Sequence, residues 1–473
     1  MANTGYWSRS VSGVSSAGPR RSSFDCKRGP EAAVKQYSCG RRTRSGSDGS
    51  TPSWPWVGPR SPTAVVLGFG AIGKAAIWPV LRAGGFKVVG VSRSQNSDEL
   101  WLKVTGNAGT YTLRADDGAN LTCIVAHDHS RVVASYVDAA LVFVSLLKGD
   151  VENGLVPLAE GVVARYREKK PVLPVFVAIN GCSEADVASA LRAAVEKYVP
   201  SAEVAKVMEG VDIIGALPDQ VCQRQGEIVL TEAPQGPLVV GCGRRDVAPR
   251  LPGTRQVPDK EFKKRVKAKL WAVNTIHAVI AYRGADKYDT IPEALDDEEI
   301  RQAAAKILKG EVALVLLKTG MPPEQVGEYV STLLARFSRM KDPVERVGRD
   351  PERKLGRYER LVGPAMACLK EGIWPEGLID VIACAIIYGS RHDENSHIKK
   401  ALAAKGVDGT LAELASLYPE QDAHAKQLVE AVTKRFAERT NGGEAKKTFV
   451  GYSCQFLEML HTLCATALEW VVD

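Results

Sequence analysis

The sequence TAVVLGFGAIGKAAIWPVLRAGG, residues 63–85, decides the fold class. Its first residues form a short, apolar, β-branched run, which is typical of a strand buried on both faces of a sheet. A glycine-rich turn follows, residues 71–81 then have helical apolar spacing, and Gly84 and Gly85 end the helix. Because FKVVGVSRS at residues 86–94 is again a strand-like run, the whole segment predicts one βαβ unit.

Predicted strands and helices continue to alternate after this unit. Apolar, β-branched runs predict strands, and runs with i, i+3, i+4 apolar spacing predict helices. The further strands are DAALVFVSL (138–146), PVLPVFVAIN (171–180), VDIIGAL (211–217), GEIVLTEA (226–233) and PLVVGC (237–242), with helices at 155–169 and 183–199. This alternation predicts an α/β fold with an open, mostly parallel, doubly wound sheet of the Rossmann type.

A segment rich in proline and charge, RRDVAPRLPGTRQVPDK at residues 244–260, interrupts the alternation. After it the apolar spacing is helical almost throughout. We therefore expect a dinucleotide-binding Rossmann-type domain over residues 61–245 and an all-α substrate and catalytic domain over residues 246–473. A ligand site is expected where the two domains meet.

Residues 1–60 form a basic tail that carries the whole charge excess of the chain. They hold ten basic and three acidic residues, a difference of seven, which equals the net charge of +7 for all 473 residues. The tail is poor in aliphatic residues and predicts disorder. An acid-poor N-terminus rich in arginine and serine is also typical of an organelle transit peptide, while a solvated tail or a misplaced start codon are the alternatives.

The rest of the chain gives no indication of a nucleic-acid or membrane partner. Its basic and acidic residues cancel, so the body has no bulk basic surface. No run reaches the roughly 18 apolar residues of a membrane span. We expect a cytoplasmic protein, with organelle targeting by the tail as the alternative.

The cysteines and histidines indicate neither a disulfide framework nor a metal site. The ten cysteines are scattered and form no CxxC pair, which is typical of free thiols in a reducing compartment. His127 and His129 have no second ligand pair, so a loop or surface role is favoured and no metal is expected.

Residues 68–73 carry a GxGxxG motif, which is a weak signal by itself. Here it follows a buried strand and opens a helix, the context that a dinucleotide-binding turn requires. The glycines permit a tight turn, and the helix N-terminus offers free N–H groups to a pyrophosphate. A purely structural glycine turn is the alternative. The predicted cofactor-binding residues are Gly68, Phe69, Gly70, Ala71, Ile72 and Gly73.

The end of the second strand bears on the choice between NAD and NADP. Enzymes that prefer NAD place an acid there to bind the ribose 2′-hydroxyl. This chain has Ser92 and Arg93 instead, and no acid before Asp98. Because arginine binds phosphate as a fork-shaped donor, we expect NADP(H) to be used at least as well as NAD(H).

Lys269, Asn274 and His277 lie in the predicted helix KLWAVNTIHA, at spacings of five and three. On an α-helix, at about 100° per residue, they are staggered over two turns, so Lys269 must reach along the helix to join the others. Oxidation of a secondary alcohol needs a base, which a lysine of lowered pKa supplies, and donors to the oxygen, which asparagine and histidine supply. The alternatives are a solvated lysine and a core histidine.

The K-x4-N-x2-H pattern at Lys269 resembles the signature of the long-chain polyol dehydrogenases, the mannitol dehydrogenase family. YDTIPEALDDEEI at residues 288–300 and ARFSRMKDPVERVGRDPERKLGRYERLVGPA at residues 335–365 are also similar to that group. The resemblance covers roughly residues 62–470. It implies metal-independent interconversion of mannitol 1-phosphate and fructose 6-phosphate with NAD or NADP.

The resemblance also implies roles for single residues. Lys269 would be the general acid/base, and Asn274 and His277 would position the substrate oxygen. Asn180 matches a further active-site asparagine of the family. Asp212 matches a family aspartate for substrate binding, although Ile213 stands where the family usually has arginine.

A basic stretch supplies candidate ligands for the substrate phosphate. Its basic residues are Arg346, Arg349, Arg353, Lys354, Arg357 and Arg360. A phosphomonoester needs about two or three such donors, and we expect Arg346, Arg349 and Lys354 to provide them. A helical face of ion pairs is the alternative. The rival functions are a dehydrogenase for an unphosphorylated polyol or hexuronate and a non-catalytic Rossmann-containing binding protein. The oligomeric state is left open, and a monomer is compatible with the sequence.

Overall fold

The structure, a computed structural model, describes residues 61–93, 100–106, 109–115, 121–225, 228–232, 236–244, 250–392 and 396–441. The predicted basic tail and Asp98 lie outside these residues. Residues 53–473 belong to one compact unit, which contains every element described below.

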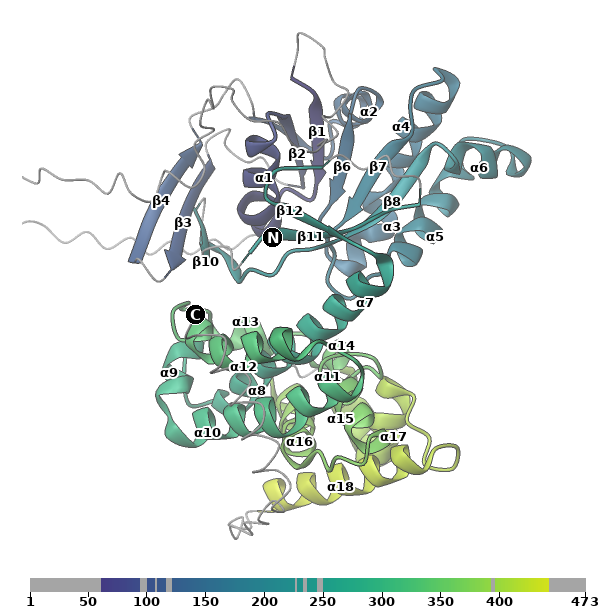
Figure 1. Cartoon of the computed structure of the whole chain (residues 1–473). Coiled ribbons are helices and arrows are strands. Elements are labelled where there is room, and N and C mark those ends of the chain that lie inside the picture. The colour runs from purple at the N-terminus through teal and green to yellow at the C-terminus, as the bar shows by residue number, and fades with distance from the viewer. Residues whose placement is uncertain are drawn as a thin grey trace, which may run out of the picture. The chain divides into compact units, whose positions relative to one another are not determined.

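An eight-stranded sheet organises the N-terminal half, in the order β12-β11-β8-β7-β6-β1-β2-β5. Six neighbouring strands run parallel. They are β5 (Leu121–Val125), β2 (Lys87–Ser92), β1 (Thr63–Leu67), β6 (Leu141–Val144), β7 (Leu173–Val177) and β8 (Val211–Leu217). In chain order this is third, second, first, fourth, fifth and sixth, the doubly wound order. The predicted Rossmann-type sheet is confirmed (Figure 1).

Two further strands extend the sheet, and a second sheet accompanies it. β11 (Leu238–Gly241) pairs antiparallel with β8, and β12 (Thr254–Val257) pairs parallel with β11, so the sheet continues past the expected boundary at residue 245. The second sheet has the order β4-β3-β10-β9. Its strands are β3 (Leu100–Gly106), β4 (Gly109–Ala115), β9 (Cys222–Gln225) and β10 (Ile228–Glu232). The polar sequences of β9 (CQRQ) and β12 (TRQV) have no apolar period that would predict them.

The two faces of the large sheet bury alternate residues of each strand, as the twofold repeat of a strand requires. In β1, Val65 and Leu67 join a core with α2 (His129–Val137), α4 (Val156–Arg167), α5 (Glu184–Val195) and α6 (Ser201–Met208). Ala64 and Val66 join the opposite core, with the π-helical turn η2 (Gly73–Ile77) and α1 (Trp78–Ala83). Short helical turns η3 (Lys148–Asp150) and α3 (Val151–Gly154) follow β6. Helices thus cover both faces of the parallel sheet (Figure 1).

The C-terminal half is helical, as predicted, and has its own apolar core. It begins with α7 (Asp259–Ala268), the π-helical turn η4 (Lys269–Asn274) and α8 (Thr275–Gly284). The following elements are α9 (Ile291–Asp296), α10 (Glu298–Ile307), η5 (Leu308–Val312), α11 (Ala313–Lys318), α12 (Pro323–Phe337), α13 (Val344–Gly348), α14 (Pro351–Lys354), α15 (Val362–Lys370), α16 (Glu376–Arg391), α17 (His397–Ala415) and α18 (Ala423–Thr440). Within the described ranges, no helix combines the length and apolar character needed to cross a bilayer.

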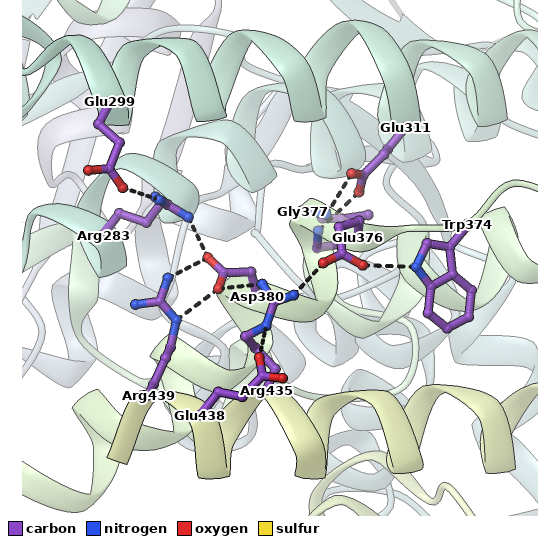
Figure 2. A network of polar contacts seen from close by, with 11 residues as sticks. Arg283, Glu299, Glu311, Trp374, Glu376, Gly377, Asp380, Arg435, Glu438 and Arg439 are labelled. Atoms are coloured by element: carbon purple, nitrogen blue, oxygen red, sulfur yellow. Dashed lines mark hydrogen bonds and ion pairs between the residues drawn. The ribbon is translucent and has the colours of Figure 1, made fainter. Parts of the chain in front are cut away.

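A buried carboxylate, Asp380 of α16, ties three helices together (Figure 2). It accepts hydrogen bonds from Arg283 at the end of α8 and from Arg435 and Arg439 of α18. The Arg439 bonds measure 2.8 and 2.7 Å and the Arg435 bond 3.0 Å. Removing one partner of a buried ion pair leaves the other as an uncompensated buried charge, which is strongly destabilising. This cluster therefore fixes the C-terminal end of α8.

Glu311 of η5 is a second buried carboxylate, and it makes stability depend on pH. It accepts from the backbone N–H groups of Gly377 at 2.7 Å and Leu378 at 3.0 Å, at the start of α16. Burial raises the pKa of Glu311 to about 7. The folded protein therefore binds a proton more tightly than the unfolded chain, and stability falls as pH rises from about 4.5 through 7.

We expect the free energy of unfolding to drop by up to about 3 kcal/mol between pH 5 and pH 8 through this group. Glu311→Gln removes the titration and should flatten the profile by that amount. Urea unfolding at the two pH values measures it, with Glu430→Gln, an exposed position on α18, as the matched control. An unchanged profile in Glu311→Gln would show that another group is responsible.

Candidate active site

The predicted glycine turn lies at the carboxyl end of β1, beside β6. Gly68 has a φ of +84°, and the backbone N–H groups of Gly68 and Phe69 both donate to the Val91 carbonyl at 2.9 Å. A Cβ atom on Gly68 would lie 2.3 Å from the carbonyl oxygen of Ser145, which follows β6. The turn thus occupies the point where strand order reverses, the usual ligand position in such sheets.

The other two glycines leave space for a ligand and for close packing. A Cβ atom on Gly73 would lie 3.0 Å from the Gly68 carbonyl oxygen and 3.2 Å from the Val66 side chain, closer than most Cβ contacts, so glycine favours this close approach of helix and strand. A Cβ atom on Gly70 would meet nothing nearer than 4.0 Å, and Gly70 is exposed. Tight turn, open backbone and close helix packing are the three functions of glycine in a pyrophosphate-binding turn, so these residues fit a dinucleotide.

The remaining residues of the motif serve mainly the fold. The Phe69 ring is buried and packs on β2, where a Cβ atom on Gly90 would lie 2.5 Å from it. Ala71 and Ile72 are half-buried in the first helical turn and pack against the core under α1. Phe69 therefore has only its backbone available to a cofactor, a distinction that the motif does not reveal.

Arg93, at the end of β2, is largely exposed and forms an ion pair with Asp150 at 3.1 Å. Asp150 belongs to η3, the turn that follows β6. Ser92 ends β2, where the adenosine ribose binds in this fold, and it has polar contacts of its own. The Asp150 carboxylate thus competes with any 2′-phosphate for the Arg93 guanidinium.

Asp150→Asn should therefore shift cofactor preference toward NADP(H). The substitution leaves Arg93 without a competing charge and removes a negative charge near the expected 2′-phosphate. The ratio of kcat/KM with NADPH to that with NADH should rise severalfold. Asp138→Asn, an exposed carboxylate paired with Lys170, is the control. A ratio that stays constant or falls would exclude Arg93 as a 2′-phosphate ligand.

Lys269 is buried at the point where the helical half meets the carboxyl ends of the sheet strands. Its Nζ atom donates to the Pro218 carbonyl at 2.6 Å, just after β8, and lies 3.5 Å from the Asn180 Oδ1 atom, which follows β7. Burial lowers the pKa of Lys269, with Asp219 opposing the shift. A buried amine whose proton is weakened, beside an exposed asparagine, is the arrangement that a general acid/base requires.

A π-helical turn, η4, runs from Lys269 to Asn274, so the expected regular α-helical stagger is wrong. Such a turn closes i→i+5 hydrogen bonds and brings residues five apart nearly into line, whereas an α-helix separates them by about 140°. Lys269 and Asn274 therefore share one side of the helix. Single π-turns inside α-helices occur frequently at functional sites.

His277, one turn further along α8, holds a neutral imidazole. Its ring stacks on Phe337 with centroids 4.5 Å apart, and burial lowers its pKa to about 3, with Arg346 and other cations adding to the effect. Its Nε2 atom is buried without a hydrogen-bond partner and lies 3.4 Å from a carboxylate oxygen of Asp342. A buried nitrogen without a hydrogen-bond partner is uncommon in folded proteins, which makes Nε2 a candidate to bond a substrate oxygen.

The three expected phosphate ligands differ in their surroundings. Arg346 forms a bidentate ion pair with the buried Asp342 carboxylate, and its Nε atom lies 2.5 Å from Oδ1. Lys354 is buried, donates to the carbonyls of Val347 and Arg349, and has a pKa lowered to about 7 by burial and by neighbouring arginines. Arg349 is exposed, with one long bond to the Arg346 carbonyl. Of the three, Arg349 has the most freedom to bind an anion.

Asp212 is not brought to Lys269. It lies near the amino end of β8, where it is buried and accepts from the Arg244 backbone N–H at 3.0 Å. Pro218, which contacts Lys269, follows the opposite end of the same strand. At about 3.3 Å per residue, roughly 20 Å of strand separates Asp212 from Pro218.

Several residues near Lys269 were not predicted from the sequence. Arg360 is largely buried, lowers the pKa values of Lys269 and His277, and accepts a 2.5 Å hydrogen bond at its carbonyl from Thr275. Arg336 of α12 is buried against Glu232. Only the family-like block at residues 335–365 indicated this region, and its many charges gave no means of choosing among them.

The sheet and the helical half together give the chain a fold like that of the long-chain polyol dehydrogenases. The resemblance seen in the sequence is confirmed, because residues 261–438 match the family model described as "Mannitol dehydrogenase C-terminal domain". In particular, three curated relatives that the chain matches are mannitol-1-phosphate 5-dehydrogenases.

Two of these relatives show how far the similarity extends. The protein of Aspergillus clavatus is 27% identical over 380 residues, which cover 75% of this chain and 93% of the relative. The protein of Brevibacillus brevis is 37% identical over 167 residues, but the match covers only 34% of this chain and 43% of the relative.

Solved structures support the fold. The mannitol 2-dehydrogenase of Pseudomonas fluorescens, in a ternary complex with NAD and D-mannitol, superposes with a TM-score of 0.64 at 16% identity, covering 81% of this chain and 92% of the other. A substrate-free D-sorbitol dehydrogenase gives a TM-score of 0.63 at 16% identity, covering 81% and 94%. At this identity the likeness concerns the fold alone.

Proposed function

We propose that this chain interconverts a polyol phosphate and its ketose phosphate, D-mannitol 1-phosphate and D-fructose 6-phosphate, with NAD or NADP. The observation that supports the proposal most strongly is the contact of Lys269 with Pro218 and Asn180. It brings a buried amine from the helical half to the strand ends that also carry the glycine turn. The names of the curated relatives supply the substrate.

In this mechanism the side chains of the protein transfer the proton and bind the reacting oxygen. The nicotinamide cofactor, when bound, accepts or donates the hydride. Lys269, in its neutral form, takes the proton of the substrate hydroxyl during oxidation and returns it during reduction. Because burial lowers its pKa, the neutral amine forms more readily than in a solvated lysine. Asn274 and His277 donate to the reacting oxygen, and Asn180 orients the Lys269 amine.

The phosphate end of the substrate is assigned to Arg349, Arg346 and Lys354, with Arg349 the most exposed of them. Arg349→Ala should raise KM for mannitol 1-phosphate at least tenfold and change activity on free mannitol little, since a charge-assisted hydrogen bond contributes about 1.5–3 kcal/mol. Arg339→Ala, another exposed arginine, is the control. Equal effects of Arg349→Ala on both substrates would exclude it from the phosphate site.

Two rival functions predict different outcomes in one assay. Absorbance at 340 nm is followed with fructose 6-phosphate, fructose or a hexuronate, each with NADH and with NADPH. Oxidation of the cofactor by fructose 6-phosphate alone supports the proposal. Turnover of only the unphosphorylated sugars indicates the sibling dehydrogenase. Cofactor binding without turnover, in folded protein, indicates the non-catalytic binding protein.

The remaining expectations concern partners and location. The expected partner is the small sugar or polyol phosphate, with no nucleic acid and no membrane partner. A cytoplasmic location, or organelle targeting by residues 1–60, stays a prediction from the sequence. Among the described residues, the cysteines are free and no three His, Cys, Asp or Glu side chains gather as metal ligands.

A further inference from the structure

The carbonyl that holds Lys269 belongs to a short loop between two sheets. Pro218 follows β8 of the large sheet, and Cys222 begins β9 of the small one. The Lys269 Nζ atom donates to the Pro218 carbonyl at 2.6 Å, a shorter contact than the 3.5 Å to the Asn180 Oδ1 atom. The position of the Lys269 amine therefore depends on how firmly this loop is held.

Glu232, at the end of β10, holds the far side of the loop. Its backbone N–H donates to the Val221 carbonyl at 3.1 Å, and its Oε1 atom accepts from the Val221 N–H at 2.8 Å. The Gln220 side chain donates to the Glu232 carbonyl at 3.1 Å. Three hydrogen bonds to one residue fix the loop against the small sheet.

Arg336 of α12 holds the same loop from the helical half. Its Nη2 and Nε atoms donate to the two Glu232 carboxylate oxygens at 2.7 and 3.2 Å. Nη2 also reaches the Asp219 carboxylate at 3.3 Å and the Asp219 carbonyl at 3.4 Å. Arg336 is 3% exposed and Glu232 4% exposed, so water cannot solvate the charge that remains if one of the two is removed.

Titratable groups from several elements surround the Lys269 amine, and of these Cys222 is a neutral thiol because burial raises its pKa to about 11. Asp219 and Cys222 approach from the loop and β9, Arg336 from α12, and Arg360 from the segment before α15. Asp219 raises the pKa of Lys269, whereas Arg336 and Arg360 lower it. The ion pair that fixes the loop therefore also sets two opposing charges around the amine.

We propose that Arg336, Asp219 and Glu232 are positioning residues that hold the Pro218 carbonyl and two opposite charges in place around the Lys269 amine. The inference rests on the proposed acid/base role of Lys269. None of the three residues needs to touch substrate or cofactor. Their effect reaches the reaction through the protonation of Lys269 and through the place where its amine is held.

The test compares two variants with opposite expected shifts. Asp219→Asn removes the charge that favours the protonated amine, so the acidic limb of kcat/KM against pH for polyol phosphate oxidation should move to lower pH by about half a unit or more. The double variant Arg336→Gln/Glu232→Gln replaces the buried ion pair by neutral side chains of similar shape. Of the two charges that it removes, that of Arg336 adds to burial in lowering the pKa of Lys269 and that of Glu232 is not a main cause of the shift, so the limb should move to higher pH. Glu430→Gln is the control and should not move it.

A second measurement needs no turnover. The rate at which acetic anhydride labels Lys269, followed by peptide mass spectrometry across pH, reports the neutral amine directly. The same opposite shifts are expected there. If the labelling profile shifts in the variants but the protein shows no turnover, the positioning role is supported and the proposed function is refuted. If the wild type turns over substrate but neither the acidic limb nor the labelling profile moves in Asp219→Asn, the positioning role is overturned and the proposed function is not.

The double variant can fail to fold, and Asp219→Asn then decides the matter by itself. Asp219 is 29% exposed, so its neutralisation leaves the buried Arg336–Glu232 pair intact. A shift to lower pH in both readouts supports the proposal. A change in kcat without movement of either profile would show a merely structural role and overturn it.

Discussion

Replacing Lys269 by methionine is expected to lower kcat about 10³-fold while leaving the protein folded and able to bind its cofactor. A positioned general acid/base contributes roughly 10²–10⁴-fold to the rate. Methionine has a similar length and suits the buried position, so the loss should fall on the proton transfer and not on stability. Initial rates at 340 nm with mannitol 1-phosphate, together with the melting temperature, measure both quantities.

Lys263→Met is the matched control, because Lys263 is an exposed lysine on α7 of the same continuous helical segment. It should retain wild-type kcat. A Lys269→Met variant within tenfold of the wild-type rate would mean that another group moves the proton, and the mechanism proposed for this site would then fail.

Gly70→Ala is expected to raise the Kd for the nicotinamide cofactor about tenfold to a hundredfold, with an unchanged melting temperature. The added methyl group meets no protein atom nearer than 4.0 Å, so the turn accepts it. It occupies the space above the exposed backbone where the pyrophosphate is expected. Overpacking typically costs about 1–3 kcal/mol, which corresponds to that range of affinity.

Titration of NADH fluorescence measures this effect, and Gly327→Ala on α12 is the control. A Cβ atom on Gly327 also meets no atom within 4 Å, but the position lies on α12 of the helical half. Its Kd should equal that of the wild type. If Gly70→Ala binds the cofactor as tightly as Gly327→Ala, the glycine turn does not hold the pyrophosphate.

Strong local patterns made the central part of the fold predictable. Residues 63–85 combine a buried strand, a glycine turn and a helix, and strand β1 lies between β2 and β6 in the parallel part of the sheet. The strands β9 and β12 have polar sequences, and each pairs with the strand next to it in the chain, β10 and β11, without an apolar repeat that would have predicted it. Their order is a tertiary effect that local periodicity does not encode.

The site was predictable as a set of residue types, and less so as a geometry. The pattern at Lys269 predicts three candidate residues, but regular α-helical spacing gives them the wrong arrangement because it does not include the π-turn. Asp212 carries the right chemistry in a family motif, yet it lies at the wrong end of its strand. Only the direction of β8 relative to β7 distinguishes these ends.

The charges that control Lys269 could not be predicted at all. Arg336 pairs with Glu232, which lies 104 positions earlier in the chain, and with Asp219, which lies 117 positions earlier. Each is an ordinary charged residue in its local sequence; Arg336 and Glu232 acquire their role through burial, and Asp219 through its contact with Arg336. The same applies to Arg360, one of many arginines in the basic stretch, which acts because it is enclosed near His277.

The most direct test of the central claim is the ratio of kcat/KM for D-mannitol 1-phosphate to that for D-mannitol, measured at 340 nm on the full chain with its preferred cofactor. A charge-assisted phosphate site contributes several kcal/mol, so we predict a ratio of about a hundred or more, carried mostly by KM. A ratio near one, or a preference for free mannitol, would contradict the assignment of this chain as a polyol-phosphate dehydrogenase.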